Sequence, residues 1–189
     1  MEESGGTSMA DGLGPVFRDY AARLREAWQS DRIPDRAEGC RRAMERLLGS
    51  ADPACIEVMD RVAQSERPVE LFRDPGLGVI QMAHPYRPGH NSPPHGHGAG
   101  GWVVYGVQRG RVEIATYDRT GGDPPLRLSR SEVLGPGQAR VYLPGELHST
   151  RMISGEGEPE AAVVLRFLSE DLSKLDRHRY GWQDVSVAG

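Results

Sequence analysis

Two histidines spaced two residues apart are the first sign of chemistry in this chain. His95 and His97 lie in the segment G-H-N-S-P-P-H-G-H-G, and on a β-strand this spacing places both side chains on one face. His148 is the candidate third ligand, because it follows the turn sequence P-G-E-L, which would return a second strand toward the first. Three neutral imidazoles can bind iron, copper, zinc or nickel and leave coordination positions for a substrate. The sequence therefore predicts an open metal site of the catalytic kind.

The residues around these histidines form two motifs. Gly89 stands six residues before His95, and the second motif reads G-x6-P-G-x2-H, ending at His148. A lone H-x-H pair also occurs on protein surfaces, so the flanking glycines and prolines are what favour a metal site. Both segments resemble the two signature motifs of the cupin superfamily. That resemblance implies an all-β fold, the double-stranded β-helix barrel or jelly roll.

Within the cupins, the chain resembles the thiol dioxygenases of the cysteine dioxygenase type. The likeness rests on L-F-R-D-P-G-L-G-V-I, P-G-H-N-S-P-P-H-G-H and W-V-V-Y-G-V-Q-R-G, and it covers roughly residues 67 to 170. It implies a non-haem Fe(II) held by His95, His97 and His148, with a thiol and O2 as reactants and a sulfinate as product. Many other cupins add a glutamate after the histidine pair, and none is present here between Gly98 and Trp102.

Three departures from that family narrow what the resemblance implies. The family's last barrel strand carries Ser-x-His-x-Tyr, whereas the matching place here reads V-L-R-F-L and ends at Leu168. The family's substrate-carboxylate arginine falls near Val69 or Glu70 in this chain. No cysteine lies in the barrel region, so the cysteine-tyrosine crosslink of the animal enzymes cannot form. The resemblance thus extends to thiol oxidation as the leading class, and not to cysteine as the substrate.

Strand alternation places further residues around the metal. Tyr105 shares a strand face with Val103, and by the resemblance this face points into the barrel. Tyr105 is the candidate catalytic group, which could donate a hydrogen bond to bound substrate or O2, or could merely fill space. Arg166 shares a face with Leu168, and the aligned positions of the thiol dioxygenases face the iron, so the resemblance implies that its guanidinium enters the cavity. A buried guanidinium needs an anionic partner, so we expect it to bind a substrate carboxylate or phosphate, with Val103 and Leu168 beside the substrate. A register slip of one residue would instead send Arg166 to solvent.

Other polar residues have a simpler interpretation. His84 and His90 are expected to be structural, which is the more frequent role of histidines on strands and turns. His178 is expected on a solvated face of the C-terminal tail. Arg140 and Tyr142 share one face of the strand that leads to His148, and the sequence leaves open whether that face is the inner one.

Composition excludes several classes of protein. The 189 residues are 38% hydrophobic and 26% charged, which is typical of a soluble globular domain. We find no apolar run of the ~20 residues that span a bilayer, and because the first fifteen residues are acidic and small, we do not expect them to be a secretory signal. Cys40 and Cys55 form no C-x-x-C motif, so we expect a cytoplasmic protein without a disulfide framework. The net charge of −4 argues against a nucleic-acid partner.

Apolar spacing predicts three helices between residues 15 and 64, each with one apolar stripe. Asp52 and Pro53 are suited to the N-cap and first position of the third helix. The acidic balance argues against a helix-turn-helix DNA reader, so we expect a helical cap on the barrel. The predicted stripe residues are Phe17, Tyr20, Ala21, Leu24, Ala27 and Trp28; Ala37, Cys40, Met44, Leu47 and Leu48; and Ile56, Met59, Val62 and Ala63.

From Val69 onward, short strands separated by Gly, Pro and Asp clusters predict a sandwich or barrel. The expected strands are 69–73, 78–86, 94–97, 102–108, 111–117, 126–132, 139–143, 148–153 and 161–168. The chain is thereby divided into a disordered N-terminus (1–14), a helical cap (15–66), a cupin barrel (67–170) and a tail packed on the barrel (171–189). The tail is expected to form a short helix with Leu172, Leu175, Tyr180 and Trp182 on the barrel.

Three functions fit these predictions. The first is an Fe(II)-dependent dioxygenase that oxidises a small anionic or thiol substrate, or cleaves another bidentate anion such as a diketone. The second is a metal-dependent isomerase or lyase that uses zinc, nickel or manganese without redox chemistry. The third is a cupin that binds a small molecule without catalysis. For the first, the expected partners are the small-molecule substrate and O2, with neither nucleic acid nor membrane, and a homodimer is left open.

Overall fold

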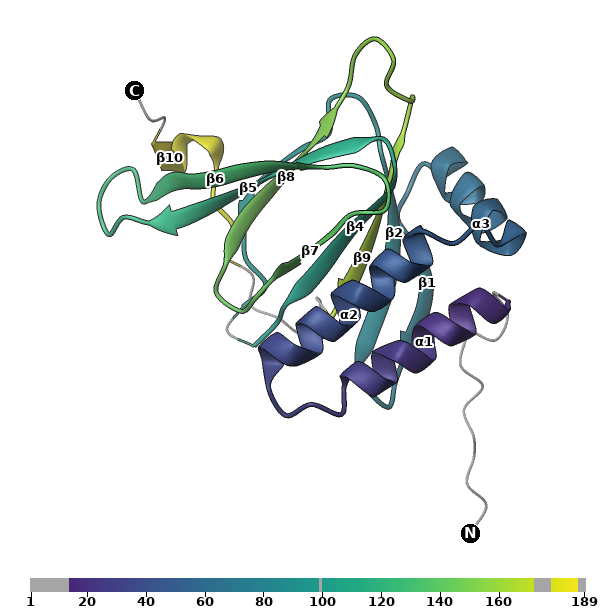
Figure 1. Cartoon of the computed structure of the whole chain (residues 1–189). Coiled ribbons are helices and arrows are strands. Elements are labelled where there is room, and N and C mark those ends of the chain that lie inside the picture. The colour runs from purple at the N-terminus through teal and green to yellow at the C-terminus, as the bar shows by residue number, and fades with distance from the viewer. Residues whose placement is uncertain (1–13, 99, 172–177, 187–189) are drawn as a thin grey trace.

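The computed structural model describes residues 14–98, 100–171 and 178–186. In these residues three helices precede the strands (Figure 1). The helices are α1 (Pro15–Ala27), α2 (Ile33–Leu48) and α3 (Pro53–Gln64), and a short 3-10 helix, η3 (Trp182–Asp184), lies in the tail. The strands are β1 (Val69–Asp74), β2 (Val79–Tyr86), β3 (Asn91–His95), β4 (Val103–Arg109), β5 (Arg111–Arg119), β6 (Leu126–Leu134), β7 (Ala139–Tyr142), β8 (Leu147–Ile153), β9 (Ala162–Leu168) and β10 (Val185–Ser186).

Two five-stranded sheets form the barrel. The first has the order β1-β2-β9-β4-β7 and the second the order β10-β6-β5-β8-β3. All neighbouring strands are antiparallel except β10, which pairs with β6 in parallel. Successive strands alternate between sheets from β2 to β4 and from β7 to β9, as the chain of a double-stranded β-helix does. The predicted fold, an all-β double-stranded β-helix barrel with an N-terminal helical segment, is confirmed.

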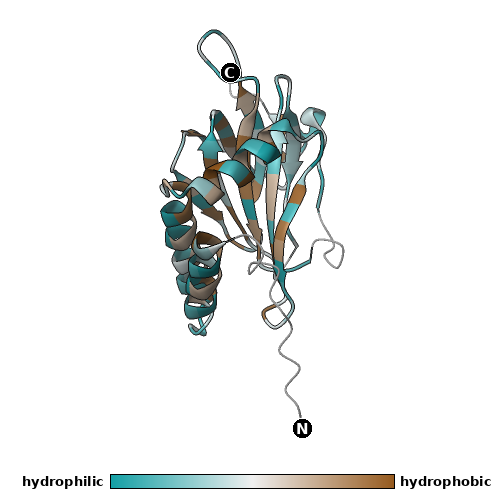
Figure 2. Cartoon of the chain, turned by 90° about the vertical axis from the view of Figure 1, so that its right-hand side faces the viewer, coloured by the Kyte–Doolittle hydropathy of each residue, from teal (hydrophilic) through white to brown (hydrophobic). Residues whose placement is uncertain are grey.

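The three helices lie against the outer face of the first sheet (Figures 1 and 2). Strand β9 serves both sides of that sheet, because successive side chains of a strand point to opposite faces. Val163, Leu165 and Phe167 pack with the helices. Val164 and Leu168 pack in the barrel interior with residues of the second sheet. The molecule therefore has three layers, and its interior is separate from the helix-sheet core.

The predicted helical stripes are largely buried, with one error. Ile56 is 45% exposed, and the contact face of α3 is instead formed by Cys55, Val58, Met59 and Val62. One residue turns a helix by about 100°, so a face centred on these positions leaves Ile56 outside. The predicted N-cap is correct, because the Asp52 side chain accepts a hydrogen bond of 2.8 Å from the Ala54 amide.

Polar contacts attach α1 to the first sheet. The Tyr20 hydroxyl donates a hydrogen bond of 2.7 Å to Gln81 Oε1, and both side chains are buried. Arg25 Nε donates a bond of 2.9 Å to Asp74 Oδ2 at the end of β1.

None of the helices among the described residues is long and apolar enough to cross a membrane.

The strand predictions hold within about two residues except at the first motif. The expected strand 94–97 is observed as Asn91–His95, so His97 lies beyond its end. The chain leaves the β3-β8 ladder there, because the Gly96 amide donates to the carbonyl of His178 over 3.0 Å. The first histidine of the pair is thus held by a strand and the second by a loop.

The tail returns to the second sheet through η3 and β10. Trp182 is 45% exposed, contrary to the prediction that it packs on the barrel. Tyr180, which was predicted to pack on the barrel, does so together with Val185 of β10, the strand that adds to β6. The resulting cluster consists of Tyr117, Leu126 and Leu147 with Tyr180 and Val185. Leu172, Leu175 and the predicted disordered residues 1–13 lie outside the described residues.

Candidate metal centre

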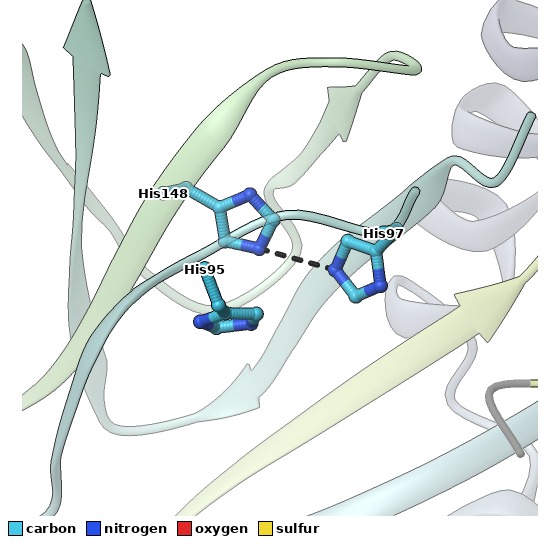
Figure 3. Close-up of side chains that lie close together, drawn as sticks. All are labelled: His95, His97 and His148. Carbon is cyan, nitrogen blue, oxygen red and sulfur yellow. Dashed lines mark hydrogen bonds between the residues drawn. The ribbon is translucent and has the colours of Figure 1, made fainter. Parts of the chain in front are cut away.

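Three histidine rings converge inside the barrel (Figure 3). The Nε2 atoms of His97 and His148 are 3.4 Å apart, and one nitrogen from each of the three rings lies within 4.8 Å of the others. Their exposed fractions are 9% for His95, 3% for His97 and 0% for His148. Two nitrogens bound to one ion at about 2.1 Å can lie at most about 4.2 Å apart, so the 3.4 Å separation is short enough for shared coordination. The group can hold a metal ion.

The strand register explains how residues distant in sequence meet. His95 on β3 lies opposite His148 on β8 in an antiparallel pair, and opposite residues project on the same face of a sheet. His97 reaches the same point from the loop after Gly96, with its ring stacked on that of His148 at 5.1 Å between centroids. The predicted assembly is therefore observed, although the β-strand argument accounts for only one of the two residues of the H-x-H pair.

A backbone carbonyl orients the first ring. His95 Nδ1 lies 3.0 Å from the carbonyl oxygen of Pro93, which can only accept a hydrogen bond. Nδ1 is therefore the protonated nitrogen, and the lone pair of the neutral ring is on Nε2. Metal-binding histidines commonly use one ring nitrogen for such an orienting bond and the other for the metal. His95 fits that role.

Two buried tyrosines flank His148. The Tyr105 hydroxyl lies 3.1 Å from His148 Nε2, which is the nitrogen that also approaches His97 at the candidate metal centre. The Tyr142 ring packs on the His148 ring at 4.4 Å between centroids. Tyr142 therefore points into the barrel, which answers the question that the sequence left open for its strand face. Arg140 forms an ion pair with Glu132 instead, with 3.1 Å between Nε and Oε1. Burial raises the pKa of Tyr142, which keeps its hydroxyl protonated.

A cavity of about 200 Å³ opens beside the histidines. His95 and Tyr105 form its metal-centre side, and Arg166 and Arg179 add two guanidinium groups to its wall. The remaining wall consists of imidazole rings, hydroxyl groups and prolines, and no acidic side chain lines the cavity among the described residues. The site is therefore positively charged before any metal binds.

Arg166 projects into the barrel, in the register that the sequence predicted. Its Nη1 donates to His84 Nε2 at 3.4 Å, and its guanidinium carbon lies 5.2 Å from the centre of the Tyr105 ring. Nε and Nη2 are buried without a hydrogen-bond partner among the described residues. Val103 and Leu168, which we expected beside the substrate, pack in the interior apolar cluster and do not line the cavity, so their contact with a substrate stays a prediction.

Two histidines that we interpreted as structural also line the cavity. Burial, together with the nearby charge of Arg166, lowers the pKa of His84 to about 2. The same two causes lower the pKa of His90, whose ring stacks on Tyr86 at 3.6 Å between centroids. Both rings are therefore neutral near pH 7. Alternation along β2 could have revealed His84, because it lies opposite the inward-facing Val164.

Comparisons with known proteins assign no family to this chain. No family model and no curated protein matches the sequence. Oxalate oxidase in complex with the substrate analogue glycolate has a TM-score of 0.42 and 18% identity over 55% of this chain and 46% of its own. KdgF from Halomonas sp. has a TM-score of 0.43 and 17% identity over 57% of this chain and 83% of its own.

A conserved protein with a double-stranded β-helix domain from Klebsiella pneumoniae has a TM-score of 0.45 and 16% identity over 64% of this chain and 87% of its own. The chain thus spans about half the length of the oxalate oxidase chain that it matches. At these scores and identities the similarities assign no activity, substrate or metal to this chain. The resemblance to the cysteine dioxygenase type stays a prediction.

Proposed function

We propose that the protein is a non-haem Fe(II)-dependent dioxygenase that uses O2 to oxidise a small anionic or thiol substrate. One observation carries the proposal. The nitrogens of three buried histidines converge beside a cavity that His95 lines, and the charged side chains in its wall, among the described residues, are two arginines. A centre of this kind offers neutral ligands to a metal and positive charge to a substrate.

His95, His97 and His148 would hold the ion, and the tautomer of His95 fits a ligand that coordinates through Nε2. When bound by three neutral ligands, Fe(II) would keep its full double charge, favour an anionic substrate donor and supply the electrons for reaction with O2. For a thiol, the net conversion adds both atoms of O2 to sulfur and yields a sulfinate. The resemblance of the motifs to thiol dioxygenases supports iron over zinc, nickel or manganese.

The chain's own residues would bind and orient the substrate. Arg166 has two guanidinium N–H groups to offer to a carboxylate, and His84 holds the opposite side of the guanidinium by accepting from Nη1. The Tyr105 hydroxyl lies 3.1 Å from a ligand nitrogen and can donate a hydrogen bond to a group bound beside it. A cavity of about 200 Å³ has the liquid volume of roughly seven waters, which limits the substrate to a small molecule.

Oxygen consumption tests the proposal. Protein loaded anaerobically with Fe(II) is given air-saturated buffer and a panel of small carboxylated thiols and diketones. We expect at least one compound to drive O2 uptake, with an oxidised product formed in proportion, and the zinc-loaded protein to consume none. If no compound raises uptake above that of metal-free protein, the proposed oxidation is wrong.

The metal ligands are tested separately. The double variant His95→Ala/His97→Ala should lose nearly all bound metal, measured by mass spectrometry of the desalted protein, because one imidazole remains at the site. Its far-ultraviolet circular dichroism should match that of the parent. Iron content equal to the parent's would place the metal elsewhere.

A further inference from the structure

A segment of the tail runs along the edge of β3 beside the metal centre. We call it the strap and define it as residues 178–180. The Gly96 amide donates to the His178 carbonyl over 3.0 Å, and the Tyr180 amide donates to the Pro94 carbonyl over 3.0 Å. These two bonds enclose an antiparallel bridge between His95 and Arg179. The strap thus extends the second sheet by one short element.

The bond pattern fixes the direction of Arg179. The residues that flank His95 and Arg179 exchange the bonds, so these two form a non-hydrogen-bonded pair, in which opposite side chains stand closest together and on the same face. His95 lies opposite His148 on its other side. Arg179, His95 and His148 therefore follow one another across one face of the sheet, and Arg179 is the member at the cavity mouth.

Arg179 and Arg166 approach the cavity from different sheets. Arg166 comes from β9 of the first sheet, and Arg179 comes from the strap at the edge of the second. Neither guanidinium has an acidic partner among the described residues. Two cations on a small cavity without acids repel each other until anions bind between them.

We propose that Arg179 is a specificity-determining residue: together with Arg166 it selects a small substrate that carries two acidic groups. Arg166 holds one group in the barrel interior, and Arg179 holds the other at the mouth. This inference rests on the proposed function for the identity of the site, and it adds the substrate class. A single carboxylate would satisfy one of the two guanidinium groups and leave the other without a counter-charge.

Calorimetric titration of the zinc-loaded full chain tests the selection with two probes of nearly equal shape. Succinate carries two carboxylates, and its monoamide succinamate carries one. We expect succinate to bind about tenfold more tightly, a factor that corresponds to about 1.4 kcal/mol. Arg179→Gln should reduce this ratio to about twofold without changing the affinity for succinamate, whereas Arg166→Gln should weaken both probes.

Arg127→Gln is the matched control, because it removes one positive charge from an exposed position on β6. It should keep the parent's ratio. The strap is paired through its backbone, so Arg179→Gln should keep the parent's zinc content and melting temperature, and these are measured first. Equal binding of the two probes by the parent, no binding of succinate, or an unchanged ratio in Arg179→Gln would each overturn the proposal.

Failure of this inference is distinguishable from failure of the proposed function. Zinc takes no part in redox chemistry, so the titration does not depend on oxidation. Discrimination that depends on Arg179, with no O2 uptake by the iron-loaded protein, would refute the oxidation alone. O2 uptake without such discrimination would refute the two-anion selection alone.

Discussion

Inside the barrel, His84 accepts a hydrogen bond from Arg166, and the charge of Arg166 in turn affects the protonation of His84. A buried cation is costly unless it is paired, and no carboxylate lies within ion-pair distance of Arg166 among the described residues. The imidazole of His84 supplies a neutral acceptor instead, at 3.4 Å from Nη1. Burial, and after it the neighbouring charge of Arg166, lowers the pKa of His84 and so prevents it from taking up a proton. The pair thus keeps one positive charge at a defined place.

Acid should destabilise the fold through His84. Burial, aided by Arg166, lowers its pKa from 6.5 to about 2, so between these values the unfolded chain binds a proton that the folded chain does not. Stability is therefore fully present above pH 6.5 and declines as the pH falls toward 2, by up to about 1.4 kcal/mol per pH unit. Urea unfolding at pH 7 and pH 5 should differ by about 2 kcal/mol from this one group.

The variant His84→Gln should reduce that difference, because glutamine has an oxygen that can accept from Arg166 and does not titrate. His178→Gln, which changes an exposed histidine of the strap, is the matched control and should keep it. Parallel pH profiles for the parent and His84→Gln would contradict the assigned cause.

Tyr105 should affect turnover more than metal binding. Tyr105→Phe removes a hydroxyl 3.1 Å from a ligand nitrogen and leaves the ring in its buried position. We expect unchanged iron content and an O2-uptake rate about tenfold lower, as the loss of one hydrogen bond worth about 1.4 kcal/mol implies. Tyr142→Phe serves as control, because that hydroxyl points to Glu132 at 3.5 Å. An unreduced rate in Tyr105→Phe would remove this hydroxyl from the reaction.

Among the elements, α2 and β4 approach so closely that a side chain at the glycine between them would displace side chains of α2. A Cβ atom on Gly106 would lie 2.4 Å from Met44 Sδ and 2.8 Å from Leu48 Cδ1. Both side chains belong to α2, which packs on the outer face of the first sheet. Gly106, which follows Tyr105 in β4, therefore sets how closely α2 can approach the barrel.

Gly106→Ala should destabilise the protein by roughly 1–3 kcal/mol, because the added methyl group overpacks a filled interface. Urea unfolding followed by tryptophan fluorescence measures the loss. Gly122→Ala, at a loop position where the nearest atom lies at 3.8 Å, should change stability by less than about 0.5 kcal/mol. Equal stabilities of the two variants would mean that α2 moves away at little cost.

Local patterns predicted most elements, because alternation and helical spacing record which side of each element is buried. Alternation along β9 placed Arg166 on the face of Leu168, and the resemblance to the thiol dioxygenases, not a local pattern, turned that face inward. The departures occur where distant segments decide the structure. His97 left the expected strand because Gly96 bonds to the strap, and Arg179 was missed because its position depends on a pairing with His95 across 84 residues. No local pattern encodes that pairing.

At the scale of the whole molecule, the helices and the barrel are held by one continuous core. Phe17, Met44 and Met59 of the three helices belong to the same buried cluster as Leu165 and Phe167 of β9. The outer face of the first sheet is therefore apolar and covered. Without the helices, this face would be a large exposed apolar patch.

A chain that begins at Arg67 should consequently aggregate, or remain soluble only as an oligomer. Size-exclusion chromatography with light scattering distinguishes these outcomes from a monomer. The full chain should unfold in one transition by both fluorescence and circular dichroism. The reason is that the helices and the outer face of the first sheet share one buried cluster. A folded monomer starting at Arg67 would instead make the helices a dispensable addition.

The two-sided role of β9 bears on how such a protein could change its substrate during evolution. Arg166 lies between Leu165 and Phe167, which fill the core, so mutations in this strand risk the fold as well as the chemistry. Position 179 has no such role in the core, because its side chain is exposed. The strap is held by backbone hydrogen bonds of the two neighbouring residues, His178 and Tyr180, which do not depend on the side chain at position 179. A change of side chain at position 179 can therefore alter which molecules enter the mouth without disturbing the core, whereas a change at position 166 acts on both.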